Sequence, residues 1–204
     1  MNILNVKEDL MKFIMENQII IPHMQLPDIS IDVSKIKVIM ISEVPPADSS
    51  DYFYSHAANP DFLLSAISLF GSAGVSIKNI NDIIDLGIYI TTAVKNPKYE
   101  YTISTNSIKE QMPIVEHEIK MFPNLKVIML MGDVARKSFN MIARKYKLKA
   151  VTGSTYKIRQ EEFYFNSIRI LPSYIMTGEN ILIEKTKREM VCEDIKNMMK
   201  IISV

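Results

Sequence analysis

Four short apolar runs stand out from the polar background of the chain, each bounded by turn residues or a charge. They cover Ile36–Ile41, Ile88–Thr91, Val127–Met131 and Ile168–Leu171. Runs of this length that are rich in β-branched residues predict buried strands. Because the runs are almost continuously apolar and do not alternate, they are typical of parallel strands covered by helices on both faces.

Between these runs, apolar residues recur at helical spacing. Asn59 and Pro60 predict the start of one helix, which Gly71 ends. Pro113 predicts the start of a second helix, and segments 134–142 and 181–202 carry two further apolar stripes. Strands that alternate with such helices predict an α/β fold, a three-layer α/β/α sandwich around a central, mainly parallel four-stranded sheet. No linker divides the 204 residues, so we expect a single domain.

Composition narrows the class of protein. Apolar residues make up 48% of the chain and charged residues 23%, a balance typical of globular proteins. No apolar run approaches the ~20 residues of a membrane helix, and the start of the chain lacks a secretory pattern, so we expect a cytoplasmic protein without a membrane span. The single Cys192 excludes an internal disulfide and a cysteine-ligated cluster. The spacing of His23, His56 and His117 forms no metal site, so we expect neither metal nor organic cofactor.

Charge is distributed unevenly along the chain. The net charge is +1, yet segment 136–159 contains eight basic residues and no acidic one. Such a segment is either a solvated helix face or a binding site for phosphates. The sequence leaves both interpretations open.

In open parallel sheets, ligands bind beyond the carboxyl ends of the strands, so the loops that follow the apolar runs are the candidate site. The first loop, residues 42–54, holds the carboxylates Glu43, Asp48 and Asp51 and three aromatic residues. Two adjacent prolines, Pro45 and Pro46, stiffen it. The other loops begin near residues 92, 132 and 172.

Four stretches in order, "SEVPP", "IYITTAVKNP", "EHEIKMFPNLKVIMLMGDVA" and "ILPSYIMTGEN", resemble the motif series of the uracil-DNA glycosylase superfamily. The resemblance is greatest to its thermophile-type and mismatch-type branches and extends from about residue 36 to the end. It implies a DNA glycosylase, which extrudes a nucleotide from the base stack and positions a water near the sugar.

The resemblance also implies roles for residues of the first two motifs. Glu43 is the first candidate for the catalytic carboxylate, and Asp48 and Asp51 compete with it, with a turn cap as the alternative for both. Phe53 would stack on the base with Tyr54 next to it, although packing against the following helix also explains aromatic residues there. Pro45 and Thr92 complete the predicted base pocket.

Two departures from the family pattern concern specificity and catalysis. Thr92 stands where many members have an asparagine that reads the pyrimidine edge, which leaves base specificity open. Ile175 and Met176 stand where the last motif usually has His-Pro, so a stabiliser of the leaving group is absent unless backbone amides or a lysine replace it. This apolar pair could instead fill the gap left by a flipped base. The iron–sulfur cysteines of the thermophile-type branch are also missing.

We therefore carry two hypotheses from the sequence. The first is a DNA glycosylase in base-excision repair that acts on uracil or another deaminated base, with Lys95, Arg136 and Ser173 contacting phosphates. The second is a catalytically silent nucleic-acid-binding protein of the same fold, whose binding would depend on Lys145, Lys147 and Lys149. DNA is the expected partner in both cases, and a monomer is the default expectation.

Overall fold

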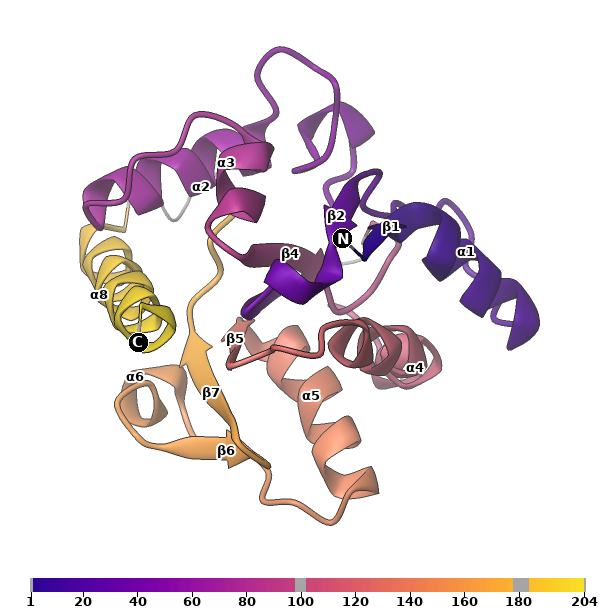
Figure 1. Cartoon of the computed structure of the whole chain (residues 1–204). Helices are drawn as coiled ribbons and strands as arrows, with labels where there is room; N and C mark the ends of the chain where they lie inside the picture. Colours follow the sequence, from indigo (N-terminus) through magenta and orange to yellow (C-terminus); the bar gives the residue numbers. More distant parts are fainter. Residues whose placement is uncertain (1, 98–101, 178–183, 204) are drawn as a thin grey trace.

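The computed structural model describes residues 2–97, 102–177 and 184–203. Its centre is a five-stranded sheet in the order β4-β3-β5-β7-β6 (Figure 1). The four predicted runs are confirmed as parallel strands: β3 (Val38–Ser42), β4 (Ile88–Thr92), β5 (Val127–Met131) and β7 (Ile168–Ser173). The sheet has a fifth strand, β6 (Phe163–Phe165), which pairs antiparallel with β7. The prediction of four strands missed β6 because a three-residue strand carries too little pattern.

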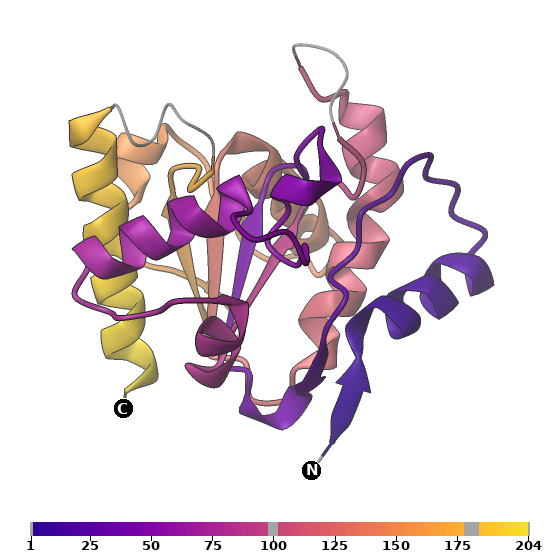
Figure 2. The same cartoon turned by 90° about the horizontal axis from the view of Figure 1, so that it is seen from above.

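Helices cover both faces of the sheet, and the predicted three-layer α/β/α sandwich is confirmed (Figures 1 and 2). One outer layer contains α2 (Asp61–Ser72), α3 (Ile80–Asp85) and α8 (Lys185–Ile202). The other contains α4 (Thr105–Met121) and α5 (Asp133–Lys145), which pack against each other. The short α6 (Thr155–Ile158) lies between α5 and β6 in the chain.

The beginnings of three helices differ from those expected from the sequence. Pro113 lies inside α4, whose true start is capped by the Ser104 hydroxyl, an acceptor for the Ser107 amide. A proline in mid-helix removes one hydrogen bond, which the surrounding packing tolerates here. Pro60 is the N-cap of α2 and not its first residue. The expected start of the last helix at Ile181 lies outside the described residues, and α8 begins at Lys185.

The N-terminal segment was not assigned from the sequence. It forms α1 (Val6–Glu16), together with a two-stranded antiparallel sheet of β1 (Ile3–Asn5) and β2 (Ser30–Asp32). Helix α1 packs on α4, where the Phe13 ring stacks on His117 at 4.2 Å between centroids. His117 Nε2 is also 2.7 Å from Asp9 Oδ2. His117 therefore joins two helices and lies away from the loops at the carboxyl ends of the strands.

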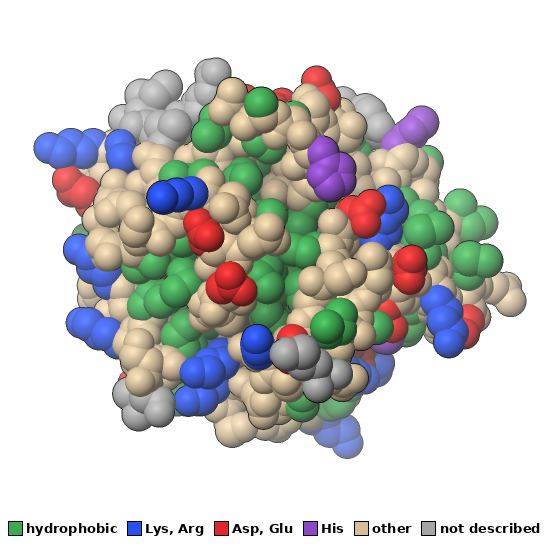
Figure 3. All heavy atoms as spheres, turned by 45° about the horizontal axis from the view of Figure 1, so that its top comes forward, with side chains coloured by type: hydrophobic (Ala, Val, Ile, Leu, Met, Phe, Trp, Pro, Cys, Tyr) green, Lys and Arg blue, Asp and Glu red, His purple; other side chains and the backbone are tan. Residues whose placement is uncertain are grey.

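The surface over α2 and α3 is partly apolar. Figure 3 shows hydrophobic side chains in the middle of this face, with most lysines and arginines along its margin. Leu64 on α2 is exposed, and Ile67 and Val75 are half-buried. None of the helices in the described parts of the chain is both long enough and apolar enough to cross a membrane.

Candidate functional site

A cavity of about 420 Å³ lies beyond the carboxyl ends of β3, β5 and β7. Glu43 enters it from the loop after β3, Asp133 from the first turn of α5, and Ile175 from the segment after β7. The remaining walls come from α6 and from the beginning of α8. Other lining residues are Gly132, Thr155, Tyr174, Thr177, Glu184 and Lys187. The cavity thus joins three of the four loops that the strand pattern indicated.

Glu43 is held in position by the beginning of α5. Its Oε1 accepts a hydrogen bond of 3.1 Å from the Val134 amide. The N-cap residue of that helix, Gly132, has no side chain that could accept this bond. A carboxylate is stabilised at a helix N-terminus by the exposed amides and the helix dipole. Gly132 has φ +99°, and a Cβ there would overlap both the Glu43 carboxylate and the Ile175 side chain. Glycine is therefore required at this close approach.

The other carboxylates of the cavity are paired with cations. Asp133 Oδ1 is 2.7 Å from Arg136, and Glu184 Oε2 is 2.6 Å from Lys187 Nζ. Among the described lining residues, Glu43 is the carboxylate without a cationic partner. It is thus the acidic group of the cavity best able to interact with a ligand.

The two residues of the last motif have different environments. Ile175 is 36% exposed and lines the cavity beside Gly132, whereas Met176 is completely buried. Met176 packs in the core and does not reach the surface where a DNA strand could approach. Of the predicted apolar wedge, Ile175 alone is positioned to contact a ligand in this conformation.

Buried hydroxyls lie at the carboxyl ends of β3 and β4, outside the lining of the cavity. Ser42 and Thr92 are opposite each other in the parallel register of β3 and β4, so their side chains lie on the same face of the sheet. The hydroxyls of Thr92 and Tyr52 face each other without a hydrogen bond of ordinary length and angle, and the Ser42 hydroxyl has no partner among the described residues. Burial raises the pKa of Tyr52 far above its ordinary value, so this hydroxyl stays protonated. Buried unpaired polar groups are rare and call for an explanation.

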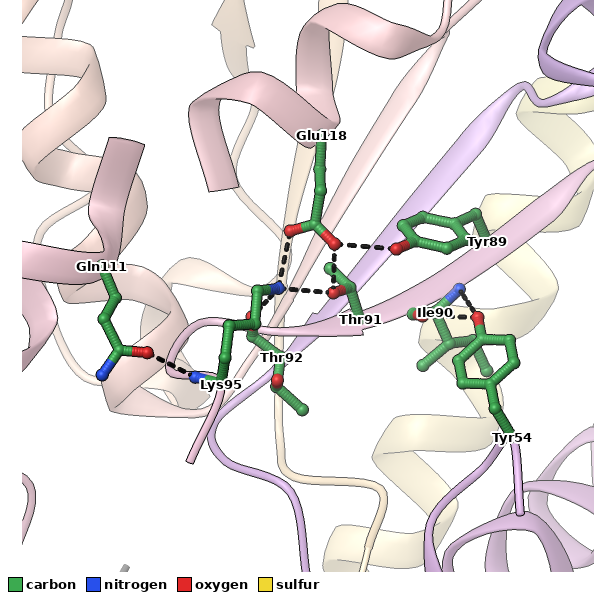
Figure 4. A network of polar contacts seen from close by, with 8 residues as sticks. All are labelled: Tyr54, Tyr89, Ile90, Thr91, Thr92, Lys95, Gln111 and Glu118. Carbon is green, nitrogen blue, oxygen red and sulfur yellow. Dashed lines mark hydrogen bonds and ion pairs between the residues drawn. The ribbon is translucent and has the colours of Figure 1, made fainter. Parts of the chain in front are cut away.

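Lys95, predicted to contact phosphates, is completely buried, and this prediction needs correction. Its Nζ is 2.6 Å from Glu118 Oε2 and also donates to the Thr91 hydroxyl and the Thr92 carbonyl (Figure 4). Glu118 Oε1 accepts from the hydroxyls of Tyr89 and Thr91. Burial lowers the pKa of Lys95, and the Glu118 carboxylate opposes that shift. Lys95 is a core residue that fixes the end of β4.

The two aromatic rings proposed for the base pocket lie in the core. Phe53 is completely buried, with its ring 5.4 Å from that of Phe62. The Tyr54 hydroxyl donates to the Ile90 carbonyl at 2.6 Å and accepts from the Ile90 amide at 3.3 Å, as Figure 4 shows. Neither ring lines the cavity. In this structure both rings pack in the core, which is the alternative to base stacking given for them above.

Asp48 and Pro45 also lie away from the cavity lining. The Asp48 carboxylate accepts from the Ser50 amide at 2.9 Å and caps the short 3-10 helix Ser49–Asp51. This bond lowers the pKa of Asp48. Pro45 is buried, and the carbonyl of the adjacent Pro46 accepts from the Gln25 side chain at 2.9 Å. These contacts fasten the loop at two points, and its stiffness stays a prediction from the proline pair.

Ser173, another predicted phosphate contact, is buried and donates to Asp194 Oδ2 of α8 at 2.6 Å. Arg159 NH2 lies 2.8 Å from the other oxygen of Asp194. Burial raises the pKa of Asp194 to about 6. This network fastens α8 to the end of β7, so Ser173 is not available to DNA in this conformation.

The basic segment 136–159 is partly neutralised within the fold. Arg136 pairs with Asp133 and donates to the Gly153 carbonyl, Lys145 pairs with Glu116, and Arg159 pairs with Asp194. Five cations of the segment remain exposed without an ion pair to a described residue: Lys137, Arg144, Lys147, Lys149 and Lys157. For these five exposed residues, a solvated helix face and a binding site for phosphates both stay predictions.

Several lining residues were not anticipated from the sequence. Thr155 lies on α6, which is too short to show a periodic pattern. Glu184 and Lys187 lie at the beginning of the last helix, which forms one wall of the cavity. The sequence signal that could have identified these two residues is their position directly after the last motif.

Comparisons with protein families and with curated proteins find no match to this chain. Among solved structures, the solution NMR structure of a "putative Uracil DNA glycosylase" from Methanosarcina acetivorans is similar. The two chains are 14% identical, with a TM-score of 0.47, over 82% of this chain and 92% of that chain. At this level of similarity, no residue role transfers to this chain.

Proposed function

We propose that this protein is a DNA N-glycosylase that hydrolyses the bond between deoxyribose and a deaminated base. The observation that carries the proposal is the position of Glu43, whose carboxylate is held by the α5 N-terminus in a cavity at the carboxyl ends of the strands. The motif resemblance supports this reaction, since it assigns the first carboxylate to the same residue.

The chemistry proposed for Glu43 uses its two oxygens differently. Oε1 is occupied by the Val134 amide, and Oε2 accepts no hydrogen bond from a described residue. A water bound to Oε2 would attack C1′ of the sugar while its proton passes to the carboxylate. The N-glycosidic bond breaks, and its electron pair leaves with the base, which then takes a proton from solvent.

The departing base carries negative charge that a donor must stabilise. Ile175 cannot donate a hydrogen bond, but Thr155 and Lys187 line the same cavity. We assign this role to Lys187, whose ammonium is paired with Glu184 at the cavity wall. A lysine thus replaces the missing histidine in the proposed mechanism.

The test is excision from single- and double-stranded oligonucleotides that contain uracil, hypoxanthine or xanthine, followed by alkaline cleavage of abasic sites. In Glu43→Gln the amide oxygen can still accept from Val134, so we expect an intact fold and an excision rate at least about a hundredfold lower. Asp48→Asn is the matched control, because its position is away from the cavity. Loss of activity in Asp48→Asn but not in Glu43→Gln would assign the reaction to Asp48.

The second candidate function, a silent nucleic-acid-binding protein, is favoured by Thr92 and Ile175, since neither supplies the group that the family uses. It predicts salt-dependent binding of oligonucleotides without abasic product. Intact strands on every substrate, beside a working control enzyme, would contradict the glycosylase and leave this alternative.

A further inference from the structure

A row of cations crosses the sheet at the amino ends of its central strands, opposite the cavity. Lys37 precedes β3, Lys126 precedes β5, and Arg169 is the second residue of β7. The Lys126 amide donates to the Lys37 carbonyl at 2.8 Å, and the Arg169 amide donates to the Lys126 carbonyl at 2.8 Å. The three residues therefore lie on adjacent strands, with Arg169 opposite Val127 and so one residue beyond Lys126.

Two residues of this row, Lys126 and Arg169, line a groove of about 680 Å³. The elements that form it, β6, β7 and the C-terminal end of α8, come together in Figure 1. Lys126, Arg169 and Lys200 line it together with Tyr164, whose side chain is 52% exposed. The Arg169 guanidinium lies 5.3 Å from the centre of the Tyr164 ring. Carbonyls of Glu161 and Phe163 accept from Arg169 at 3.0 and 3.4 Å. These bonds hold the guanidinium in place and leave three of its five N–H groups for a ligand.

The positive charges of the groove are not balanced by the protein that is described. Lys126, Arg169 and Lys200 form no ion pair with a described residue, and Glu162 is the single carboxylate in the described lining. Arg159 also lines the groove, but Asp194 and Glu193 neutralise it. Three cations that line one groove repel one another, so without a ligand they reduce the stability of the fold.

The end of α8 accounts for one of the cations. Lys37 Nζ donates to the Ile202 carbonyl at 3.2 Å, which stabilises the C-terminal end of the helix. The ammonium groups of Lys126 and Lys200 donate no hydrogen bond to a carbonyl of the described residues. The Arg169 guanidinium donates to the carbonyls of Glu161 and Phe163 and not to the end of α8. Helix capping therefore explains Lys37 but not the groove cations.

We propose that this groove binds the phosphate of a nucleotide, with the base stacked on Tyr164. Lys126, Arg169 and Lys200 supply the charge, and the side chains of Ser167 and Asn197 in the lining supply neutral hydrogen-bonding groups. An exposed aromatic ring beside cations is the arrangement that holds single-stranded nucleic acid without sequence preference. The site is separate from the Glu43 cavity, because the two lie at opposite ends of the same strands.

The experiment measures fluorescence anisotropy of a labelled oligothymidylate of about ten nucleotides with the full chain, and competition by unlabelled oligothymidylate or thymidine monophosphate. We expect Lys126→Gln and Arg169→Gln each to weaken binding and to reduce the salt slope by about one. Tyr164→Ala should weaken binding about tenfold. Lys12→Gln, on the exposed face of α1, is the matched control and should bind like the wild type.

Competition by the monophosphate at the same concentration of nucleotide units indicates a free-nucleotide site, and competition by the oligonucleotide alone indicates a strand-binding site. Equal weakening in Lys126→Gln and Lys12→Gln would overturn the proposal, as would the absence of binding by the wild type. Thermal unfolding gives a second readout, because Lys126→Gln should be as stable as the wild type or more stable without ligand and gain less from added oligonucleotide. The excision assay with Glu43→Gln is a separate measurement, so the proposed glycosylase activity and the proposed nucleotide groove can each fail without the other.

Discussion

Thr91 and Thr92 are adjacent in the sequence and completely buried, yet their hydroxyls have opposite environments. Thr91 faces α4 and belongs to a network in which Lys95, Glu118 and Tyr89 satisfy one another (Figure 4). Thr92 faces the other side of the sheet, toward Ser42 and Tyr52, and its hydroxyl is unpaired within the described structure. Alternation along a strand is the cause, because successive side chains point to opposite faces.

The comparison separates a structural polar cluster from a candidate functional one. A fully satisfied buried network adds rigidity to the core, whereas an unsatisfied buried group costs free energy that a bound ligand could recover. Proximity to the motif therefore does not show which polar residue acts on a ligand. Lys95, three residues after Thr92, belongs to the structural cluster.

We expect the largest loss of stability when the buried network around Thr91 loses its cation. Lys95→Met leaves the Glu118 carboxylate buried without its cation, and we expect the free energy of unfolding to fall by about 3–5 kcal/mol. Urea denaturation measures it. Lys95→Met combined with Glu118→Leu should recover much of the loss, because both charges are then absent. A single variant as stable as the wild type would show that the ion pair is not formed.

A second effect tests a buried carboxylate through pH. The pKa of Asp194 is about 6 in the folded state, above the 3.8 of an unperturbed aspartate. The native state therefore binds more protons between these values, so this group's contribution to stability is present below about pH 4 and is lost as pH rises through 6. Relative to Asp194→Asn, the wild type should lose about 2–3 kcal/mol of stability between pH 4 and 7. Parallel pH profiles of the two proteins would contradict the burial of Asp194.

We expect the smallest change of stability when the unpaired Thr92 hydroxyl is removed. Thr92→Val keeps the shape and removes the unpaired hydroxyl, so stability should be unchanged or higher by up to about 1 kcal/mol. Thr91→Val is the matched control and should lose about 1–3 kcal/mol, because it removes hydrogen bonds to Glu118 and Lys95. If the Thr92 hydroxyl forms a hydrogen bond with the edge of the base, Thr92→Val will also lose excision activity. Equal losses of stability in both variants would remove the distinction between the two faces.

The sequence predicts the layers of this fold better than its site. Continuous apolar runs identify the four parallel strands, since burial on both faces leaves a strong signal in composition. The position of a side chain at a strand end depends on which face it takes, and a one-residue shift reverses that face. Of the predicted site residues, Glu43 lines the cavity, whereas Lys95, Ser173 and Phe53 are buried.

The partners of those residues come from distant parts of the chain. Lys95 pairs with Glu118 of α4, and Ser173 with Asp194 of α8. Neither pairing leaves a local pattern that could be read in advance. Long-range polar contacts are therefore the part of the site that only the folded structure provides.

The two hydrogen bonds between Tyr54 and Ile90 have a consequence for assembly. β4 is at one border of the sheet, and its outward backbone groups could template a strand from another molecule. The Tyr54 hydroxyl occupies both the amide and the carbonyl of Ile90, so an incoming strand would have to displace a buried ring. At the opposite border, β6 offers three residues. Sheet growth by strand addition is thus blocked by a phenol on one side and limited by length on the other.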